Sequence, residues 1–573
     1  MRPAAPNRGA RTMTEHVPHP GLVLIFGALA LPWLRGAVRS ALVIALPLLA
    51  LWLVWQVGDG PNWQLRFLGH ELMPLRGDKL SRLFGTIFAL MAAGGGLFAL
   101  GQKSRVELPA AFVYAGSAIG AAFAGDLLTL FVFWELMAVG STLVLWSAGT
   151  RPAYRAAQRY LMIHLLGGVI LLAGITGHVA QTGSVAFTRM APDSAAHWLI
   201  LAGFLINAAA TPISAWLPDA YPEASWSGTV FLSAFTTKTA VYALIRGFPG
   251  TELLVWVGLA MAFYGIVYAL LENDMRRILA YSIVNQVGFM LVGIGIGTEM
   301  ALNGAAAHAF AHILYKGLLL MSAGSVLMMT DRRKCSELGG LFHTMPLTTT
   351  CGTIGALAIS AFPFTSGFVS KSMISQAAAD GHLLVVWLLL AAASAGVFLH
   401  AGIKFPWFVF FQKDSGLRPA EPPASMRWAM VFFAFLCIAL GIWYEPLYAM
   451  LPFAVDYVPY TGAHVLTQTQ LLLFSGLAFF VALPYLRRTL TITLDVDWVY
   501  RRALPAVVAA CAAVIERAMA SASLVARELT SRLAALVYRH HGPQGGLART
   551  WTTRSMAIWV LVLLLGYLIL YFL

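Results

Sequence analysis

Residues 127–148 read LLTLFVFWELMAVGSTLVLWSA, an apolar run with one carboxylate, Glu135, near its middle. A helix of about 20 mainly apolar residues crosses the hydrocarbon core of a bilayer. The run is long enough to do so, and it would hold Glu135 far from either surface. It predicts a membrane-spanning helix with an ionisable side chain in its interior.

The same pattern recurs along the chain. Of the 573 residues, 59% are apolar and 11% are charged, and mean hydropathy is +0.75. Soluble domains carry about 25% charged residues. We therefore predict one all-α, polytopic membrane domain. About 16 spans are expected, at 21–34, 38–56, 82–100, 107–124, 127–148, 157–179, 196–217, 227–247, 252–272, 277–297, 301–329, 347–378, 383–411, 427–447, 467–486 and 555–573.

Basic residues alternate between the loops and predict the topology. Loops after even-numbered spans are poor in lysine and arginine, apart from the one with Arg66, Arg76 and Lys79. Cytoplasmic loops carry an excess of basic residues, so the loops after odd-numbered spans face the cytoplasm and both termini lie opposite. These loops hold Arg35, Arg39, Lys103, Arg105, Arg151, Arg155, Arg159, Arg276, Arg277, Arg332, Arg333, Lys334, Lys413, Arg418, Arg487 and Arg488.

Charge and cysteine usage exclude several classes of function. The net charge of +13 comes from these short loops, so nucleic-acid binding is not predicted. The cysteines are Cys335, Cys351, Cys437 and Cys511, and none forms a C-x-x-C pair. This excludes an iron–sulfur or structural zinc site built from this chain alone. We predict no cofactor and no metal.

Two predicted spans are interrupted by proline. Pro212 follows Asn207-Ala-Ala-Ala-Thr at the end of the seventh span, and Pro363 lies with Gly367 inside the twelfth. Proline removes a backbone donor, and a freed carbonyl in lipid must be satisfied by protein or water. Such breaks can simply kink a helix. Paired breaks in two halves are also typical of inverted repeats with an ion site at the bilayer midplane, which is our interpretation.

Ionisable residues lie in the middle of two predicted spans, Glu135 in the fifth and Lys238 in the eighth. A charge at a helix centre costs roughly 2.5–3.5 kcal/mol on translocon scales, so several such residues imply a function that offsets the cost. An acid and a base in neighbouring spans would alter each other's proton affinity. The pair predicts that Lys238 releases and rebinds a proton.

The eleventh span carries three ionisable residues on one helix face. His308, His312 and Lys316 are spaced four residues apart, so they rise about 12 Å along the axis. Histidine titrates near neutral pH and suits a proton relay. Polar packing is the alternative, and zinc binding by H-x-x-x-H lacks a nearby acidic or thiol ligand. With Lys371 in the twelfth span, these residues predict movement of protons or other monovalent cations.

Three other polar residues have plainer interpretations. Asp126 begins the fifth span and is positioned to cap its helix. His164 and His400 stand alone within apolar runs, where a histidine usually makes a structural hydrogen bond.

Several motifs together resemble a known family. They are Phe123-Ala-Gly-Asp-Leu-Leu-Thr-Leu-Phe-Val-Phe-Trp-Glu135-Leu, Ala215-Trp-Leu-Pro-Asp-Ala-Tyr221, Thr237-Lys-Thr-Ala-Val-Tyr-Ala-Leu, Arg277-Ile-Leu-Ala-Tyr-Ser, and His308-x-x-x-His312-x-x-x-Lys316-Gly-Leu-Leu. Across about residues 80–415 the chain resembles the antiporter-like subunits shared by respiratory complex I and Mrp-type cation/proton antiporters, and is most similar to their proton-conducting transporter type.

The resemblance implies two inverted five-helix repeats, each a half-channel, joined by a central axis of charged residues. By position, Gln286 falls where some members have histidine. The implied catalytic residues are Glu135 of the fifth helix, Lys238 of the eighth, the relay residues His308, His312 and Lys316 of the eleventh, and Lys371 of the twelfth.

The chain departs from the family at Asn207, where the broken seventh helix normally carries a lysine paired with the glutamate. Asparagine forms hydrogen bonds but carries no proton. Glu135 would therefore need another partner, and Lys238 is the candidate. The second half is expected to be the more complete proton path.

The resemblance and the composition together predict the organisation of the chain. Residues 505–538 show helical amphipathicity but too many charges to span, so we expect a helix along the membrane surface or against a partner. The predicted parts are a polar tail (1–20), N-terminal helices (21–104), a first (105–248) and a second (249–415) half-channel repeat, additional helices (416–490), an amphipathic lateral helix with a linker (491–550) and a C-terminal helix (551–573).

The expected function is that of a proton-translocating subunit in a multi-subunit Na+/H+ antiporter of a bacterial cytoplasmic membrane. Its expected partners are other membrane subunits, protons, a monovalent cation and the lipid bilayer. The alternatives are a proton-pumping subunit of a complex I-like NADH-quinone oxidoreductase or hydrogenase complex, in which it would have no redox site of its own, a membrane subunit of an inorganic-carbon uptake system, and a scaffold with an inactive channel.

Overall fold

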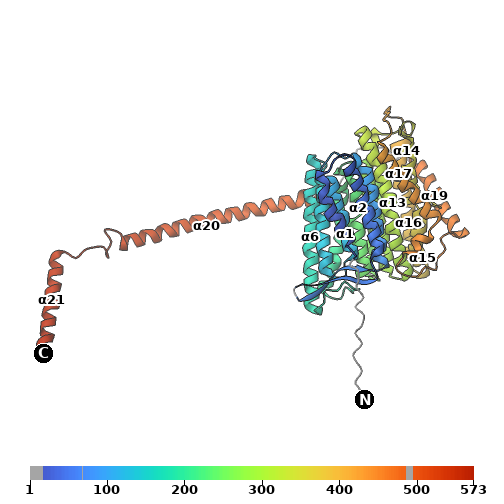
Figure 1. Ribbon diagram of the computed structural model, residues 1–573. Helices are drawn as coiled ribbons and strands as arrows, with labels where there is room; N and C mark the ends of the chain where they lie inside the picture. The colour runs from blue at the N-terminus through green and yellow to red at the C-terminus, as the bar shows by residue number, and fades with distance from the viewer. Residues whose placement is uncertain (1–16, 68, 485–494) are drawn as a thin grey trace, which may run out of the picture. The chain divides into compact units, whose positions relative to one another are not determined.

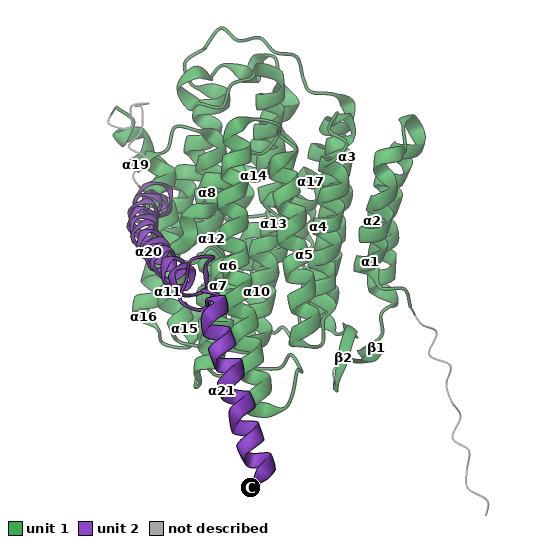
Figure 2. Cartoon of the chain, turned by 90° about the vertical axis from the view of Figure 1, so that its left-hand side faces the viewer, with its two compact units in different colours: residues 1–496 green, residues 497–573 purple. Residues whose placement is uncertain are grey.

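The computed structural model describes residues 17–67, 69–484 and 495–573, and its regular secondary structure is almost entirely helical (Figure 1). It forms two compact units, residues 1–496 and 497–573 (Figure 2). In unit 1 the helices are α1 (Pro20–Ala30), α2 (Gly36–Gln56), α3 (Lys79–Phe98), α4 (Glu107–Phe123), α5 (Leu127–Trp146), α6 (Arg151–Thr182), α7 (Ala195–Asn207), α8 (Trp216–Ala220), α9 (Gly228–Leu232), α10 (Thr236–Gly247), α11 (Leu253–Leu271), α12 (Met275–Ile296), α13 (Glu299–Thr330), α14 (Pro346–Ile359), α15 (Ser366–Asp380), α16 (Leu384–Val397), α17 (Ala424–Ile442), α18 (Glu445–Ala449) and α19 (Gly462–Ala482).

Within the described residues, thirteen helical segments are long and apolar enough to cross a membrane. The predicted all-α membrane fold is confirmed, while the number of 16 spans stays a prediction. Four predicted spans appear as shorter helices. The first and fourth spans correspond to the short helices α1 and α4, and the seventh and twelfth spans are shortened because they are broken. The tail before residue 17 and the basic pair at 487–488 lie outside the described residues.

One element was not expected, an antiparallel hairpin of β1 (Gly60–Phe67) and β2 (His70–Gly77). Gly69 adopts φ +82° at its turn, a conformation that glycine reaches at little cost. Asp126 caps α5 by accepting from the Thr129 amide at 2.7 Å, and its second oxygen accepts from the Met73 amide at 2.8 Å. The predicted cap is therefore present, and it also ties the hairpin to α5.

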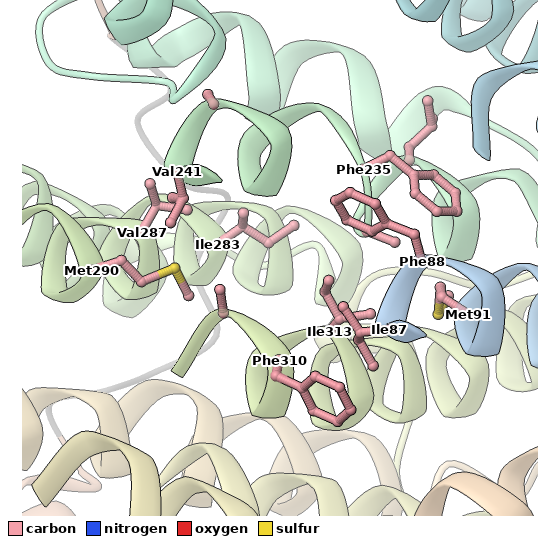
Figure 3. Packing of buried hydrophobic residues seen from close by; sticks show 14 of the residues in the cluster. Ile87, Phe88, Met91, Phe235, Val241, Ile283, Val287, Met290, Phe310 and Ile313 are labelled. Carbon is pink, nitrogen blue, oxygen red and sulfur yellow. The ribbon is translucent and has the colours of Figure 1, made fainter. Parts of the chain in front are cut away.

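The centre of unit 1 is formed by α3, α10, α12 and α13. α12 is buried along nearly its whole length, as is α13 from Ala301 to Val326. Close apolar packing joins these helices (Figure 3). Its labelled members are Ile87, Phe88, Met91, Phe235, Val241, Ile283, Val287, Met290, Phe310 and Ile313.

Both expected helix breaks are present, and each begins before its proline. α7 ends at Asn207, and Ala209 adopts φ +58°. α14 ends at Ile359, and Ala361 adopts φ +57°. Non-glycine residues seldom adopt positive φ, so each break is a specific backbone structure and not a simple kink. A third interruption, which has no proline, separates α9 from α10 at residues 233–235.

Unit 2 contains a short π-helix (Val499–Ala503), the long helix α20 (Leu504–His541) and α21 (Thr553–Phe572). α20 covers the predicted amphipathic helix, and its side chains are exposed throughout. Its length and composition also satisfy the criteria for a span, so the surface location stays a prediction.

Candidate functional site

The predicted relay residues of α13 lie fully inside the helix bundle. His308, His312 and Lys316 have no exposed surface. Alanine occupies most of the positions around the two histidines, and small residues let membrane helices approach closely. The alanine-rich sequence therefore brings this face of α13 against its neighbours, which include α10, α12 and α15.

His308 is the best-connected member of the relay. Its Nε2 lies 3.1 Å from Gln286 Oε1 and its Nδ1 lies 3.2 Å from Ser370 Oγ. Tyr315 Oη also donates to Gln286 Oε1, at 3.1 Å. If His308 donates from Nε2 to Gln286, Nδ1 accepts from the Ser370 hydroxyl while the ring is neutral.

The Ser370 hydroxyl has a second acceptor, the Ser366 carbonyl at 3.0 Å. When it donates there, its oxygen is free to accept from Nδ1–H of a doubly protonated His308. Rotation of one hydroxyl therefore accommodates both protonation states of His308 without moving a helix.

His312 lies between the charged groups of the site. Neither of its ring nitrogens has a hydrogen-bond partner among the described residues, although the ring packs edge-on against Tyr315 at 5.3 Å. It is within electrostatic range of Lys238, Lys316 and Lys371. A buried imidazole with two unsatisfied nitrogens is suited to accept and pass on a proton.

Each of two buried lysines binds a carbonyl freed by a helix interruption. Lys371 Nζ donates to the Ile359 carbonyl, at the last residue of α14, over 3.1 Å. Lys238 Nζ donates to the Ser233 carbonyl, between α9 and α10, over 2.7 Å. The breaks therefore supply the acceptors that allow an ammonium group to be buried. No proline marks the break at Ser233, so sequence reasoning missed this acceptor.

The remaining contacts complete what we call the buried axis, defined as Lys238, His308, His312, Lys316 and Lys371. Lys316 Nζ donates to Ser282 Oγ at 2.9 Å on α12. Lys371 Nζ also lies 4.8 Å from the centre of the Phe289 ring, a cation–π contact. The structure brings these five side chains together from α10, α13 and α15.

Glu135 lies apart from this axis. Its side chain packs against Gly168 of α6, where an added Cβ would come within 1.9 Å of Oε1. Oε1 has no hydrogen-bond partner among the described residues, and Lys238 bonds to Ser233 and Thr237 instead. The pairing expected between Glu135 and Lys238 is therefore not found.

Asn207 and His164 lie near the first break and also have unsatisfied atoms. Both polar atoms of the Asn207 side chain are buried without a partner among the described residues, as is Nε2 of His164. The His164 ring packs edge-on against Trp216 at 4.6 Å, and Trp216 Nε1 donates to the Ile206 carbonyl at 3.1 Å. His164 thus lies beside the end of α7, which its isolated position in the sequence did not reveal.

Sequence reasoning used Arg276 only as a marker of topology. The guanidinium of Arg276 is buried and donates to the carbonyls of Pro222, Ala224 and Ser225 over 2.7–2.8 Å. These carbonyls follow α8, beyond the first break. Arg276 on α12 thereby connects the second half of the chain to the broken helix of the first.

The sequence also matches known proteins. Residues 124–398 match the transmembrane family described as "NADH:quinone oxidoreductase/Mrp antiporter", and this region holds the whole buried axis. An uncharacterized protein of Mycobacterium tuberculosis is 30% identical, covering 72% of this chain and 71% of its own. An NADH-quinone oxidoreductase subunit of Desulforudis audaxviator is 29% identical, and the match covers 73% of this chain and 92% of that subunit. A Na(+)/H(+) antiporter subunit of Alkalihalophilus pseudofirmus is 25% identical, and the match covers 72% of this chain and 90% of that subunit.

Solved structures share the fold at 22% identity. A chain of the Mrp complex from Dietzia sp. DQ12-45-1b superposes with a TM-score of 0.68, covering 79% of this chain and 99% of that one. A chain of the membrane-bound sulfane sulfur reductase, an archaeal respiratory membrane complex, gives 0.70, covering 96% and 100%. The match to the family, these relatives and the helical membrane fold together show that the chain belongs to the NADH:quinone oxidoreductase/Mrp antiporter family of multi-pass membrane subunits.

Proposed function

We propose that this chain is the proton-translocating subunit of a multi-subunit monovalent cation/proton antiporter, with sodium as the expected cation. The buried axis is the main support for the proposal. Burying five ionisable side chains inside a membrane bundle costs free energy, and this cost implies that the side chains have a function. The similarity to the Na(+)/H(+) antiporter subunit of Alkalihalophilus pseudofirmus supports the antiporter assignment.

In this proposal protons move by local transfers along the buried axis, from Lys238 at the end of the first predicted repeat into the second repeat. Lys238, Lys316 and Lys371 each donate a hydrogen bond to a buried acceptor. His312 lies within electrostatic range of all three lysines. A proton arriving at one lysine raises the free energy of a proton on its neighbours, because like charges repel strongly at low dielectric. Sequential release along the axis follows from that repulsion, and His308 stores a proton by rotation of Ser370.

The second candidate is a proton-pumping subunit of an NADH-quinone oxidoreductase or a related respiratory complex. Two observations favour it: the match spans 92% of the Desulforudis audaxviator relative, and the shared fold extends over 96% of this chain in the archaeal respiratory complex. In either assembly the buried axis has the same role, and the neighbouring subunits supply the driving reaction.

The test uses inverted vesicles that contain the complete complex. We expect Lys371→Ala and Lys238→Ala each to abolish sodium-dependent proton movement, followed by quenching of a pH-sensitive dye. Lys103→Ala, which removes an exposed lysine, is the matched control. Unchanged transport in both axis variants would reject the proposal, and identification of the co-purifying subunits separates the antiporter from the respiratory complex.

A further inference from the structure

A charged cavity lies at the end of unit 1 where α10 stops and α3 and α13 begin. It encloses about 650 Å³. Its rim is exposed and holds Asp59, Lys79, Arg189 and Glu299, while its floor includes the buried Ile245 and Leu302. We call this cavity the vestibule. The hairpin ends here, and the topology predicted from basic loops places this end opposite the cytoplasm.

One face of α10 leads from the vestibule to the buried axis. Lys238, Tyr242 and Arg246 are spaced four residues apart, so this face connects the cavity to Lys238 over about 12 Å. Arg246 lines the cavity, and its side chain is only 10% exposed. Tyr242 is fully buried one turn further in.

The contacts along this face are polar and well aligned. Arg246 donates from a terminal nitrogen to Asp78 Oδ2 at 2.7 Å, and its Nε donates to Tyr242 Oη at 2.8 Å. The Tyr242 oxygen is therefore an acceptor from Arg246, and no acceptor for its own proton occurs among the described residues. The next ionisable residue along the face is Lys238, whose backbone lies about 6 Å further along the axis. Its ammonium group points still further inward, to the Ser233 carbonyl.

We propose that the vestibule is the port through which Lys238 exchanges protons with the non-cytoplasmic solvent, with Tyr242 as the transfer group and the Asp78–Arg246 pair as the gate. The inference rests on the proposed function and adds a route to it. When one proton binds at the Tyr242 oxygen and the phenol proton is released toward the Lys238 amine through intervening water, Tyr242 is left unchanged.

The ion pair is suited to gating and not to carrying protons. Burial by itself raises the pKa of Asp78, but the charge of Arg246 and the hydrogen bond from the Ser81 amide outweigh it and hold that pKa below its ordinary value. Asp78 therefore stays ionised near neutral pH, and Arg246 stays close to it. Opening requires Arg246 to move toward the exposed acids of the rim, Asp59 and Glu299.

Accessibility of the vestibule can be measured without any transport. We would place Ile245→Cys in a Cys511→Ser background, since the other three cysteines are buried. A charged, membrane-impermeant thiol reagent added to the non-cytoplasmic side should label the thiol at this position, and Asp78→Asn should accelerate labelling several-fold. Labelling only from the cytoplasmic side would overturn the proposal of a port. Absence of labelling both with Asp78 intact and in the Asp78→Asn variant would overturn it as well.

Transport then tests the transfer group. Tyr242→Phe keeps the ring that packs against Phe84 at 5.4 Å and removes only the hydroxyl. We expect proton movement to fall by roughly a hundred-fold or more, as for loss of a positioned proton-transfer group. Glu71→Gln, an exposed carboxylate of the hairpin, is the control for charge at this end.

The two proposals fail in different ways. If Lys238→Ala abolishes transport while Tyr242→Phe retains the normal rate, the port is wrong and the proposed function stands. If Lys238→Ala and Lys371→Ala both transport normally in correctly assembled complexes, the proposed function itself fails, and the labelling result still reports on the cavity alone.

Discussion

Single residues determine whether a charge can be buried in this bundle. Gly367 lies where an added Cβ would come within 1.8 Å of the Ala358 carbonyl, beside the Ile359 carbonyl that accepts from Lys371. The glycine therefore lets α15 begin close to the end of α14. Without that approach the Lys371 ammonium would lose its acceptor.

We predict that Gly367→Ala greatly reduces transport although Lys371 is retained. Overpacking of this kind costs about 1–3 kcal/mol and displaces the backbone. Gly462→Ala, where no atom lies within 4 Å of the added Cβ, is the matched control. Thermal unfolding of the purified complex and vesicle transport should both respond to the first change only, and equal behaviour of the two variants would contradict the argument.

A second prediction concerns pH and the Asp78–Arg246 pair. Because the pKa of Asp78 is lower in the folded state, its contribution to stability is complete above about pH 4 and is lost only as pH falls through the folded pKa. The stability difference between the natural chain and Asp78→Asn should thus be constant from about pH 8 to about pH 5. A difference that shrinks on acidification within that range would show that another group titrates there.

At the scale of elements, broken helices and the segments that hold them do most of the functional positioning. The ends of α7 and α14 are each followed by a residue of positive φ, Ala209 and Ala361, and α9 ends without proline. Freed carbonyls at the second and third breaks accept from lysines. The loop beyond the first break is held instead by Arg276, from the other half of the chain.

We predict that Arg276→Gln loosens the loop at residues 222–225 and lowers stability by about 1–3 kcal/mol, the cost of leaving a buried acceptor without its hydrogen bond. The Ala224 carbonyl would lose its donor, whereas the Pro222 and Ser225 carbonyls would keep only the longer contacts from Arg333 and Thr229, each at 3.3 Å. Arg332→Gln, at a largely exposed arginine, should change stability little. Proteolysis and thermal unfolding of the complex measure the effect, and identical profiles for the two variants would argue against a clamp between the halves.

At the scale of the whole molecule, the end of unit 1 at Asp495 contacts helices of the second predicted repeat. Asp495 accepts from Tyr264 at 2.6 Å and from Tyr281 at 2.7 Å, which ties this point of the chain to α11 and α12. Unit 2 follows, and α20 has exposed apolar side chains along its length. A helix of this kind is stable only against lipid or a partner.

Removal of residues 497–573 is therefore predicted to weaken assembly with neighbouring subunits while unit 1 still folds. Unit 1 holds the buried axis and its own apolar core, so its thermal stability in detergent should change little. Co-purification of partner subunits measures the loss. Full retention of every partner by the shortened chain would contradict this role for α20.

The sequence by itself determined the membrane class, most of the spans, both proline breaks and the five residues of the buried axis, because hydropathy and helical spacing are local properties. Only the tertiary structure decided which groups meet. It separated Glu135 from Lys238, showed the carbonyls that hold Lys238 and Lys371, added the hairpin and paired Arg276 with a distant loop. Such contacts join residues far apart in the chain, so no local pattern specifies them.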